Sequence, residues 1–297
     1  MHLNSAFGVG GGGGRQAKWR DHVRMGVRNA LCVTAAAACV AALMACGDGG
    51  HSGSPSAPSG AAASGAALPA SPEALSRQLA SVETRLRRAI RAWRAAGQPQ
   101  GAPPDAVAVG ALYVQRVVRL LARRPDLEAA TLRRLPPWSA RETRELTAAR
   151  RDLSRLSAGW PAHHVATGPP EPLGRLLRYY RAAQSRFGIR WQILAAINLV
   201  ESAFGRVQNP SVAGAQGPMQ FMPATWRAYS LGGDIDNPHD AILAAANLLR
   251  HGGAPGDYSR ALYAYNPSPK YVDAVQRYAR LMARDRNAVY LLYSWRP

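Results

Sequence analysis

The chain has 297 residues, and its 37 lysine and arginine residues against 18 aspartate and glutamate residues give a formal net charge of +19. Hydrophobic residues make up 47% of the sequence, which is enough for packed cores and excludes a chain that is disordered throughout. So large a positive charge favours an anionic partner such as a cell wall, a lipid surface or nucleic acid. Nucleic acid is disfavoured, because the arginines are scattered and no zinc finger, basic zipper or aromatic RNA-binding motif is present.

Residues 1–45 are typical of an export signal rather than of a folded element. Three arginines precede an apolar run over residues 30–43, which is short for a membrane span but suits the core of a signal peptide. The run ends in LMAC, which resembles the lipobox of bacterial lipoproteins, in which the cysteine, here Cys46, receives lipid. An ordinary signal peptide with an incidental cysteine is the alternative, and Met25 is an alternative start.

The segment after the signal predicts a flexible tether. Residues 46–72 are mostly Gly, Ser, Ala and Pro, a composition that cannot bury enough apolar surface to become ordered. Cys32 and Cys39 lie in the leader, so processing at Cys46 would leave one lipidated cysteine and no disulfide. We therefore expect an exported lipoprotein of the cell envelope that is anchored to a membrane through the lipid on Cys46.

Residues 73–165 predict an Arg-rich helical accessory region. After an SPE start signal, apolar residues recur at steps of three and four, which predicts a long amphipathic helix. A second helix is expected over residues 107–122, and Ser139 with Glu142 forms a capping box for a third helix that runs to about residue 157. We expect this region to dock on the C-terminal domain, with a partner-binding arm as the alternative; protein partners cannot be read from the sequence.

A helix over residues 191–204 carries the first candidate catalytic residue, Glu201. Glu201 belongs to the apolar face of this helix, which consists of Ile193, Leu194, Ile197 and Val200. We expect its carboxyl group at the rim of a core, in the last turn before a glycine cap at Gly205. Burial and the negative end of the helix dipole would both raise its pKa, as a general acid requires. A solvated surface glutamate is the alternative.

The segment GAQGPMQFMPATW, which begins at Gly214, predicts a tight turn followed by a short helix that starts near Gly217 and Pro218. The amide of Gln220 offers both a donor and an acceptor, which suits recognition of hydroxyl and acetamido groups of a sugar. Met219 and its apolar neighbours can pack in a core or line a groove.

A third segment, ALYAYN, ends a helix at a point where Pro267 blocks its extension. Tyr265 and Asn266 therefore stand at a helix end, where polar groups can be presented. With Ser202 and Gln220 they form the polar shell that we expect around Glu201.

The order of these three motifs, ES at 201–202, GPMQ at 217–220 and AYN at 264–266, resembles the catalytic domain of the soluble lytic transglycosylases. That family has a lysozyme-like helical fold and acts on peptidoglycan glycan strands, and the resemblance covers about residues 171–284. It implies a mainly α protein, in which a lysozyme-like catalytic domain over residues 171–297 follows the Arg-rich helical region.

The resemblance also implies roles for particular residues. Glu201 would be the general acid and then the general base, and Tyr265 would help to position its carboxylate. The expected substrate-binding residues are Ser202, Met219, Gln220, Tyr265 and Asn266. The sequence departs from the family at Pro218, where leucine is common, and in the two prolines that follow Asn266.

The presence of one candidate catalytic carboxylate affects which cleavage reaction we expect. Most glycosidases use two carboxylates, and the next acid after Glu201 is Asp234. In peptidoglycan, the C6 hydroxyl of N-acetylmuramic acid can act as the nucleophile, so we expect cleavage of its β-1,4 bond to N-acetylglucosamine with formation of 1,6-anhydromuramic ends. The alternatives are a hydrolytic muramidase that uses Asp234, Asp236 or Asp240, and an inactive glycan-binding lipoprotein. We favour helix-capping roles for the aspartates, with Asn237 as the N-cap.

The sequence gives no reason to expect a metal or another cofactor. Its histidines lack ligand spacing, no GxSxG elbow is present, and the aspartates lack EF-hand spacing. The apolar stretch AVYLLYSW at 288–295 is expected to pack back on the domain.

Overall fold

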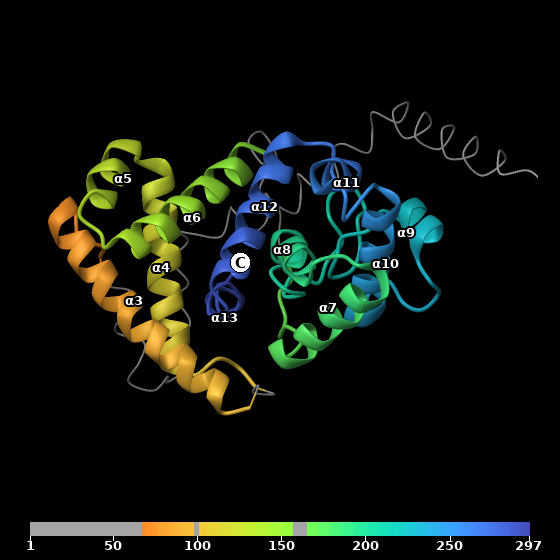
Figure 1. Ribbon diagram of the computed structural model, residues 1–297, viewed down its shortest axis with the longest axis horizontal. Coiled ribbons are helices and arrows are strands. Elements are labelled where there is room, and N and C mark those ends of the chain that lie inside the picture. The colour runs from red at the N-terminus through yellow and green to blue at the C-terminus, as the bar shows by residue number, and fades with distance from the viewer. Residues whose placement is uncertain (1–66, 98–100, 157–164) are drawn as a thin grey trace, which may run out of the picture. The chain divides into compact units, whose positions relative to one another are not determined.

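The computed structural model describes residues 67–97, 101–156 and 165–297, and in these ranges the protein is mainly helical (Figure 1). The helices are α3 (Pro72–Ala95), α4 (Asp105–Arg123), α5 (Pro125–Leu132), α6 (Pro137–Leu156), α7 (Leu173–Phe187), α8 (Trp191–Ser202), α9 (Pro223–Tyr229), α10 (Pro238–His251), α11 (Tyr258–Tyr265), α12 (Pro269–Arg284) and α13 (Ala288–Tyr293). The predicted mainly α class is confirmed.

The predicted signal peptide, Cys46 and most of the tether lie outside the described residues. In the part of the chain that is described, no helix is both long and apolar enough to cross a membrane. The predicted boundaries at residues 73–165 and 171–297 stay predictions.

The accessory helices begin and pack as their sequences dictate. Ser71 caps α3, because its hydroxyl accepts a hydrogen bond from the backbone N–H of Ala74 at 3.2 Å and Pro72 occupies the first helical position. Helices α3 and α4 approach closely at Gly110, where a Cβ would lie 3.2 Å from the side chain of Leu86. The small residue thus allows the two amphipathic faces to meet.

One expectation for this region was wrong, and one helix was missed. Helix α6 begins at Pro137, so Ser139 lies inside its first turn, fully buried, and forms no capping box. The proline, which favours the first position of a helix, sets the start two residues earlier. The short helix α5 was not predicted, because its apolar residues do not gather on one face.

The accessory helices dock on the C-terminal helices mainly through α6, which packs along α12. Buried residues of both regions belong to one hydrophobic cluster. The expectation that residues 73–165 form a docked packing module therefore holds for their described part.

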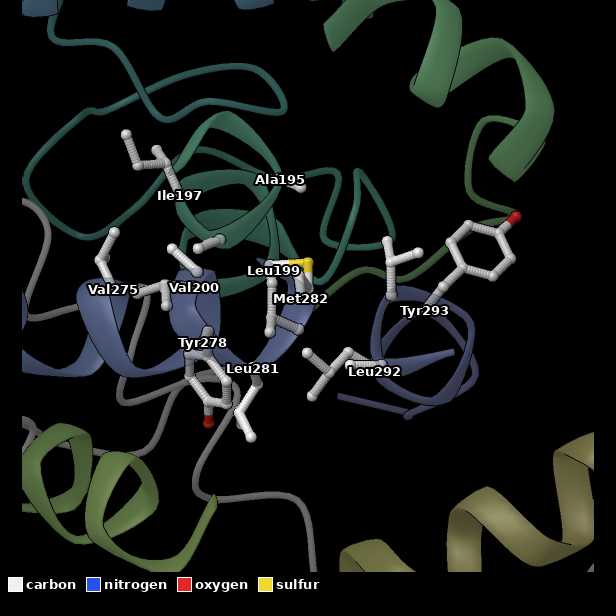
Figure 2. Close-up of a cluster of buried hydrophobic side chains, with 14 of the residues drawn as sticks. Ala195, Ile197, Leu199, Val200, Val275, Tyr278, Leu281, Met282, Leu292 and Tyr293 are labelled. Atoms are coloured by element: carbon white, nitrogen blue, oxygen red, sulfur yellow. The ribbon is translucent and has the colours of Figure 1, made fainter. Parts of the chain in front are cut away.

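Helix α8 lies at the centre of the C-terminal helices and packs against α7, α10, α12 and α13. All its residues from Ile193 to Ser202 are buried, as befits a helix that is apolar on nearly every side. Figure 2 shows part of this core, in which side chains of α8, α12 and α13 come together. Helix α13 is buried along its whole length, so the prediction that residues 288–295 pack back is confirmed.

Helix α10 starts as predicted. The side chain of Asn237 caps it by accepting a hydrogen bond from the N–H of His239 at 2.9 Å, and Asp240 lies in the first turn.

Helix α7 is capped at its C-terminal end by Gly188, which adopts the left-handed conformation with φ of 71°.

Candidate active site

Glu201 lies in the last turn of α8, and only 1% of its surface is exposed. The prediction of a rim position was wrong, since the surrounding helices enclose the carboxyl group. The alternative of a solvated surface glutamate is wrong for the same reason. Helix α8 ends at Ser202, and the left-handed residue that caps it is Ala203, with φ of 51°, rather than Gly205.

The partner of the Glu201 carboxyl group is Tyr271, a residue that the sequence analysis missed. The Tyr271 hydroxyl donates a hydrogen bond of 2.6 Å to Glu201 Oε1. The second oxygen, Oε2, is buried and has no hydrogen-bond partner among the described residues. Tyr271 belongs to the buried, apolar face of α12. In the sequence, the helical spacing of the apolar residues on that face is the only signal that points to it.

Burial raises the pKa of Glu201 from 4.5 to about 8, and the hydrogen bond from Tyr271 lowers it in part. No neighbouring carboxylate is among the causes of the shift. The carboxyl group is therefore protonated at neutral pH, the state in which it can donate a proton.

The turn after α8 is a hairpin-like loop and not the start of a helix. Gln216 and Phe221 pair in an isolated antiparallel bridge with both hydrogen bonds at 2.9 Å. Between them, Gly217 and Gln220 adopt left-handed conformations with φ of 71° and 49°. Helix α9 begins only at Pro223, so the predicted helix start near Gly217 and Pro218 was wrong.

Buried side chains of α8 hold this loop by its backbone carbonyls. Asn198 Nδ2 and Ser202 Oγ donate to the carbonyl oxygen of Pro218 at 2.7 and 2.6 Å. Asn198 Oδ1 in turn accepts a bond of 2.6 Å from the Tyr180 hydroxyl. Ser202 is fully buried and its hydroxyl is engaged by Pro218, so in this conformation it supports the loop from inside.

The Tyr265 hydroxyl anchors the other side of the loop by donating a 2.6 Å hydrogen bond to the carbonyl oxygen of Met219. The ring of Tyr265 stacks on that of Tyr271, with centroids 6.3 Å apart and planes 5° apart. Tyr265 thus contacts both Tyr271 and the loop. The Met219 side chain is fully buried and contributes to the core.

Asn266 and Gln220 complete the set that the sequence singled out. Asn266 caps the C-terminal end of α11 and is 3% exposed, and its Nδ2 has no hydrogen-bond partner within the described residues. Gln220 Nε2 donates to the carbonyl oxygen of Gly217 at 2.9 Å, which stabilises the turn. Among the described residues, the site therefore contains two buried polar atoms without a hydrogen-bond partner: Glu201 Oε2, which can carry the proton of the neutral acid, and the amide donor Asn266 Nδ2.

The three aspartates of the GGDIDNPHD segment form local hydrogen bonds. Asp234 Oδ1 accepts from the N–H of Asp236 at 2.9 Å, and Asp240 Oδ2 accepts from the N–H of Asp234 at 3.1 Å. These bonds shape the loop before α10, whereas the expected first-turn position within α10 is confirmed for Asp240 alone. Within residues 67–97, 101–156 and 165–297, no group of three or more His, Cys, Asp or Glu side chains could hold a metal ion.

The mainly helical fold, with a buried carboxyl group of raised pKa at Glu201, is consistent with a lysozyme-like domain. Residues 178–286 match the family described as Transglycosylase SLT domain, and this part of the chain belongs to the soluble lytic transglycosylase family. This match supports, in general terms, lytic transglycosylase-type cleavage of peptidoglycan by this domain. Comparisons with curated proteins and with solved structures find no match.

Proposed function

We propose that the protein is a peptidoglycan lytic transglycosylase that cleaves the β-1,4 bond between N-acetylmuramic acid and N-acetylglucosamine, with Glu201 as its acid and base. The observation that carries the proposal is the buried Glu201 carboxyl group, whose pKa is raised to about 8 and which lies beside Tyr271 in a domain of this family.

In the first step, Glu201 donates its proton to the bridging oxygen, and the bond from that oxygen to C1 of the muramic residue breaks. N-acetylglucosamine leaves with a free 4-hydroxyl group. In the second step, the C6 hydroxyl oxygen of the same muramic residue bonds to C1, and its proton passes to the Glu201 carboxylate. The acid is regenerated, no water is consumed, and the product carries a 1,6-anhydro ring.

The surrounding residues support these steps in distinct ways. Tyr271 stabilises the carboxylate between the two proton transfers, because its hydroxyl donates to Oε1. Asn266 supplies an unpartnered amide donor for a sugar oxygen or acetamido group. The left-handed turn at Gln220 directs the loop toward the substrate. Tyr265 and Ser202 position this loop, and Met219 provides its buried anchor.

A hydrolytic muramidase would require a second carboxylate to activate water. The hydrogen bonds of Asp234 and Asp240 within their own loop favour the transglycosylase. Mass spectrometry of sacculi digested with the purified protein tests the choice: anhydro ends support the proposal, and reducing ends would assign a muramidase. Glu201→Gln should bind glycan without cleaving it, and undiminished turnover of this variant would refute the role of Glu201.

The proposed location follows from the leader sequence. Signal cleavage before Cys46 and lipid attachment to it would leave the enzyme on a membrane of the cell envelope, with residues 46–72 as the tether to peptidoglycan. Mass spectrometry of the mature N-terminus tests this, and Cys46→Ala should move the protein from the membrane fraction to the soluble fraction.

A further inference from the structure

An arginine-lined cavity lies away from Glu201, where α3, α7, the first residue of α8 and the segment around α13 meet. Its volume is about 770 Å³. Trp191 and Tyr290 are among the residues that line it. The lining also contains four arginines: Arg91, Arg94, Arg181 and Arg286. Among the residues that the structure describes, no acidic side chain belongs to the lining.

The charge of this cavity is not neutralised within the described part of the chain. Elsewhere arginines pair with acids, as Arg87 does with Glu142 and Asp285, but none of the four lining arginines forms an ion pair with a described carboxylate. Arg94 donates to the side-chain oxygen of Asn287 at 2.9 Å. Asp285, the acid next to Arg286 in sequence, is engaged by Arg87 at 2.5 Å. Three of the four, Arg91, Arg181 and Arg286, are exposed to solvent and Arg94 is half-buried, so the cavity presents positive charge that an anion can reach.

The walls are held by aromatic packing. Trp93 of α3 packs edge-on against Tyr290 of α13 with ring centroids 5.1 Å apart, which joins the helix that carries Arg91 to the opposite wall. Trp191 is the first residue of α8, and its backbone N–H donates a hydrogen bond of 2.8 Å to Gln184 Oε1 of α7. The cavity thus combines fixed apolar walls with guanidinium groups, which bind carboxylates through paired N–H donors.

We propose that this cavity binds the free carboxylates of peptidoglycan stem peptides. The inference rests on the proposed function, which brings the protein to peptidoglycan, a polymer whose negative charge resides in its peptides rather than in its N-acetylated sugars. Trp191 and Glu201 lie at opposite ends of α8, about 15 Å apart at 1.5 Å per residue. The cavity is therefore a second contact with the polymer, separate from the reacting bond, and it holds the enzyme on its substrate.

The test measures peptide binding by calorimetry in the full-length Glu201→Gln background, so that cleavage does not interfere. The probe is a synthetic stem tetrapeptide with free carboxylates, and its fully amidated counterpart is the control ligand. We expect Arg181→Gln with Arg286→Gln to weaken binding of the free peptide by about tenfold or more, because two charge-assisted contacts are lost. The matched control is Arg178→Gln with Arg284→Gln, which removes the same charge from positions that are likewise exposed but lie outside the lining. It should change binding less than twofold, roughly the size of a screened long-range effect.

Equal losses in the two double variants would overturn the inference, as would equal binding of the free and amidated peptides. Binding of inorganic phosphate or anionic phospholipid vesicles without binding of the peptide would overturn it too. Thermal unfolding of each variant controls for folding. If a double variant does not fold, the single variants Arg181→Gln and Arg178→Gln replace the lining pair and the control pair, respectively. Cleavage by the parent protein is assayed separately: normal anhydro products without peptide binding refute only this inference, whereas peptide binding without cleavage refutes only the proposed function.

Discussion

The stability cost of Glu201 offers a test of the site that is independent of substrate. Glu201→Gln keeps the size of the side chain and an oxygen that can accept the hydrogen bond from Tyr271, but it cannot ionise. If the buried carboxyl group resists ionisation, the variant should be more stable than the parent, by an amount that depends on pH.

The size of the effect follows from the shift in pKa. Below pH 4.5 the carboxyl group is protonated in both the folded and the unfolded chain, so ionisation contributes nothing. Between 4.5 and about 8 the unfolded chain ionises first, and the free energy of unfolding of the parent falls by up to about 1.4 kcal/mol per pH unit. At pH 7 the parent should therefore be about 3 kcal/mol less stable than Glu201→Gln, and the difference stops growing above about pH 8.

Chemical denaturation of both proteins between pH 5 and 8 measures this difference. Glu83 provides a matched control, since it is also buried and its pKa is also raised to about 8, but it lies on α3 in the accessory region. Glu83→Gln should reproduce the pH dependence and keep the cleavage activity that Glu201→Gln loses. A stability difference that does not change with pH for Glu201→Gln, or loss of cleavage in Glu83→Gln, would refute the reasoning.

Three further substitutions probe the parts around Glu201. Tyr271→Phe removes the bond that lowers the pKa of Glu201, so the alkaline limb of the pH–rate profile should move to higher pH and turnover should fall about tenfold; an unmoved limb contradicts this role. Gly217→Ala should destabilise the protein more than Gly214→Ala in thermal unfolding, because both glycines are left-handed but only at Gly217 would a Cβ meet a backbone oxygen, at 2.0 Å; equal losses would show that the contact is unimportant. Ser202→Ala should lower the free energy of unfolding by about 1 to 3 kcal/mol, measured in urea, since it removes buried hydrogen bonds to the loop, and an unchanged value would argue against that support.

Local patterns in the sequence predicted much of the fold. The apolar periodicity of residues 75–93 and 193–200 placed α3 and α8, although α8 ends at Ser202 rather than at residue 204. Asn237 with Pro238 marked the start of α10. Pro267 correctly placed the end of α11 at Tyr265 and Asn266. These signals act over one or two helical turns, so a single sequence contains them.

The features that the sequence did not reveal depend on contacts across the chain. The partner of Glu201, Tyr271, is 70 residues away, and no local spacing relates the two. The burial of Glu201 likewise depends on α12, which packs on α8 and brings Tyr271 against the carboxyl group. The start of α9 was misplaced because Pro218 and Pro223 both suit a first helical position, and only the left-handed Gln220 excludes the earlier one.

Cleavage of purified sacculi in water labelled with heavy oxygen tests the central claim most directly. If the C6 hydroxyl of the muramic residue takes the place of water and Glu201 serves as acid and base, the new glycan ends will be 1,6-anhydro and will contain no label, and Glu201→Gln will release none. Reducing ends that carry heavy oxygen, or release of fragments by Glu201→Gln at the rate of the parent protein, would contradict it.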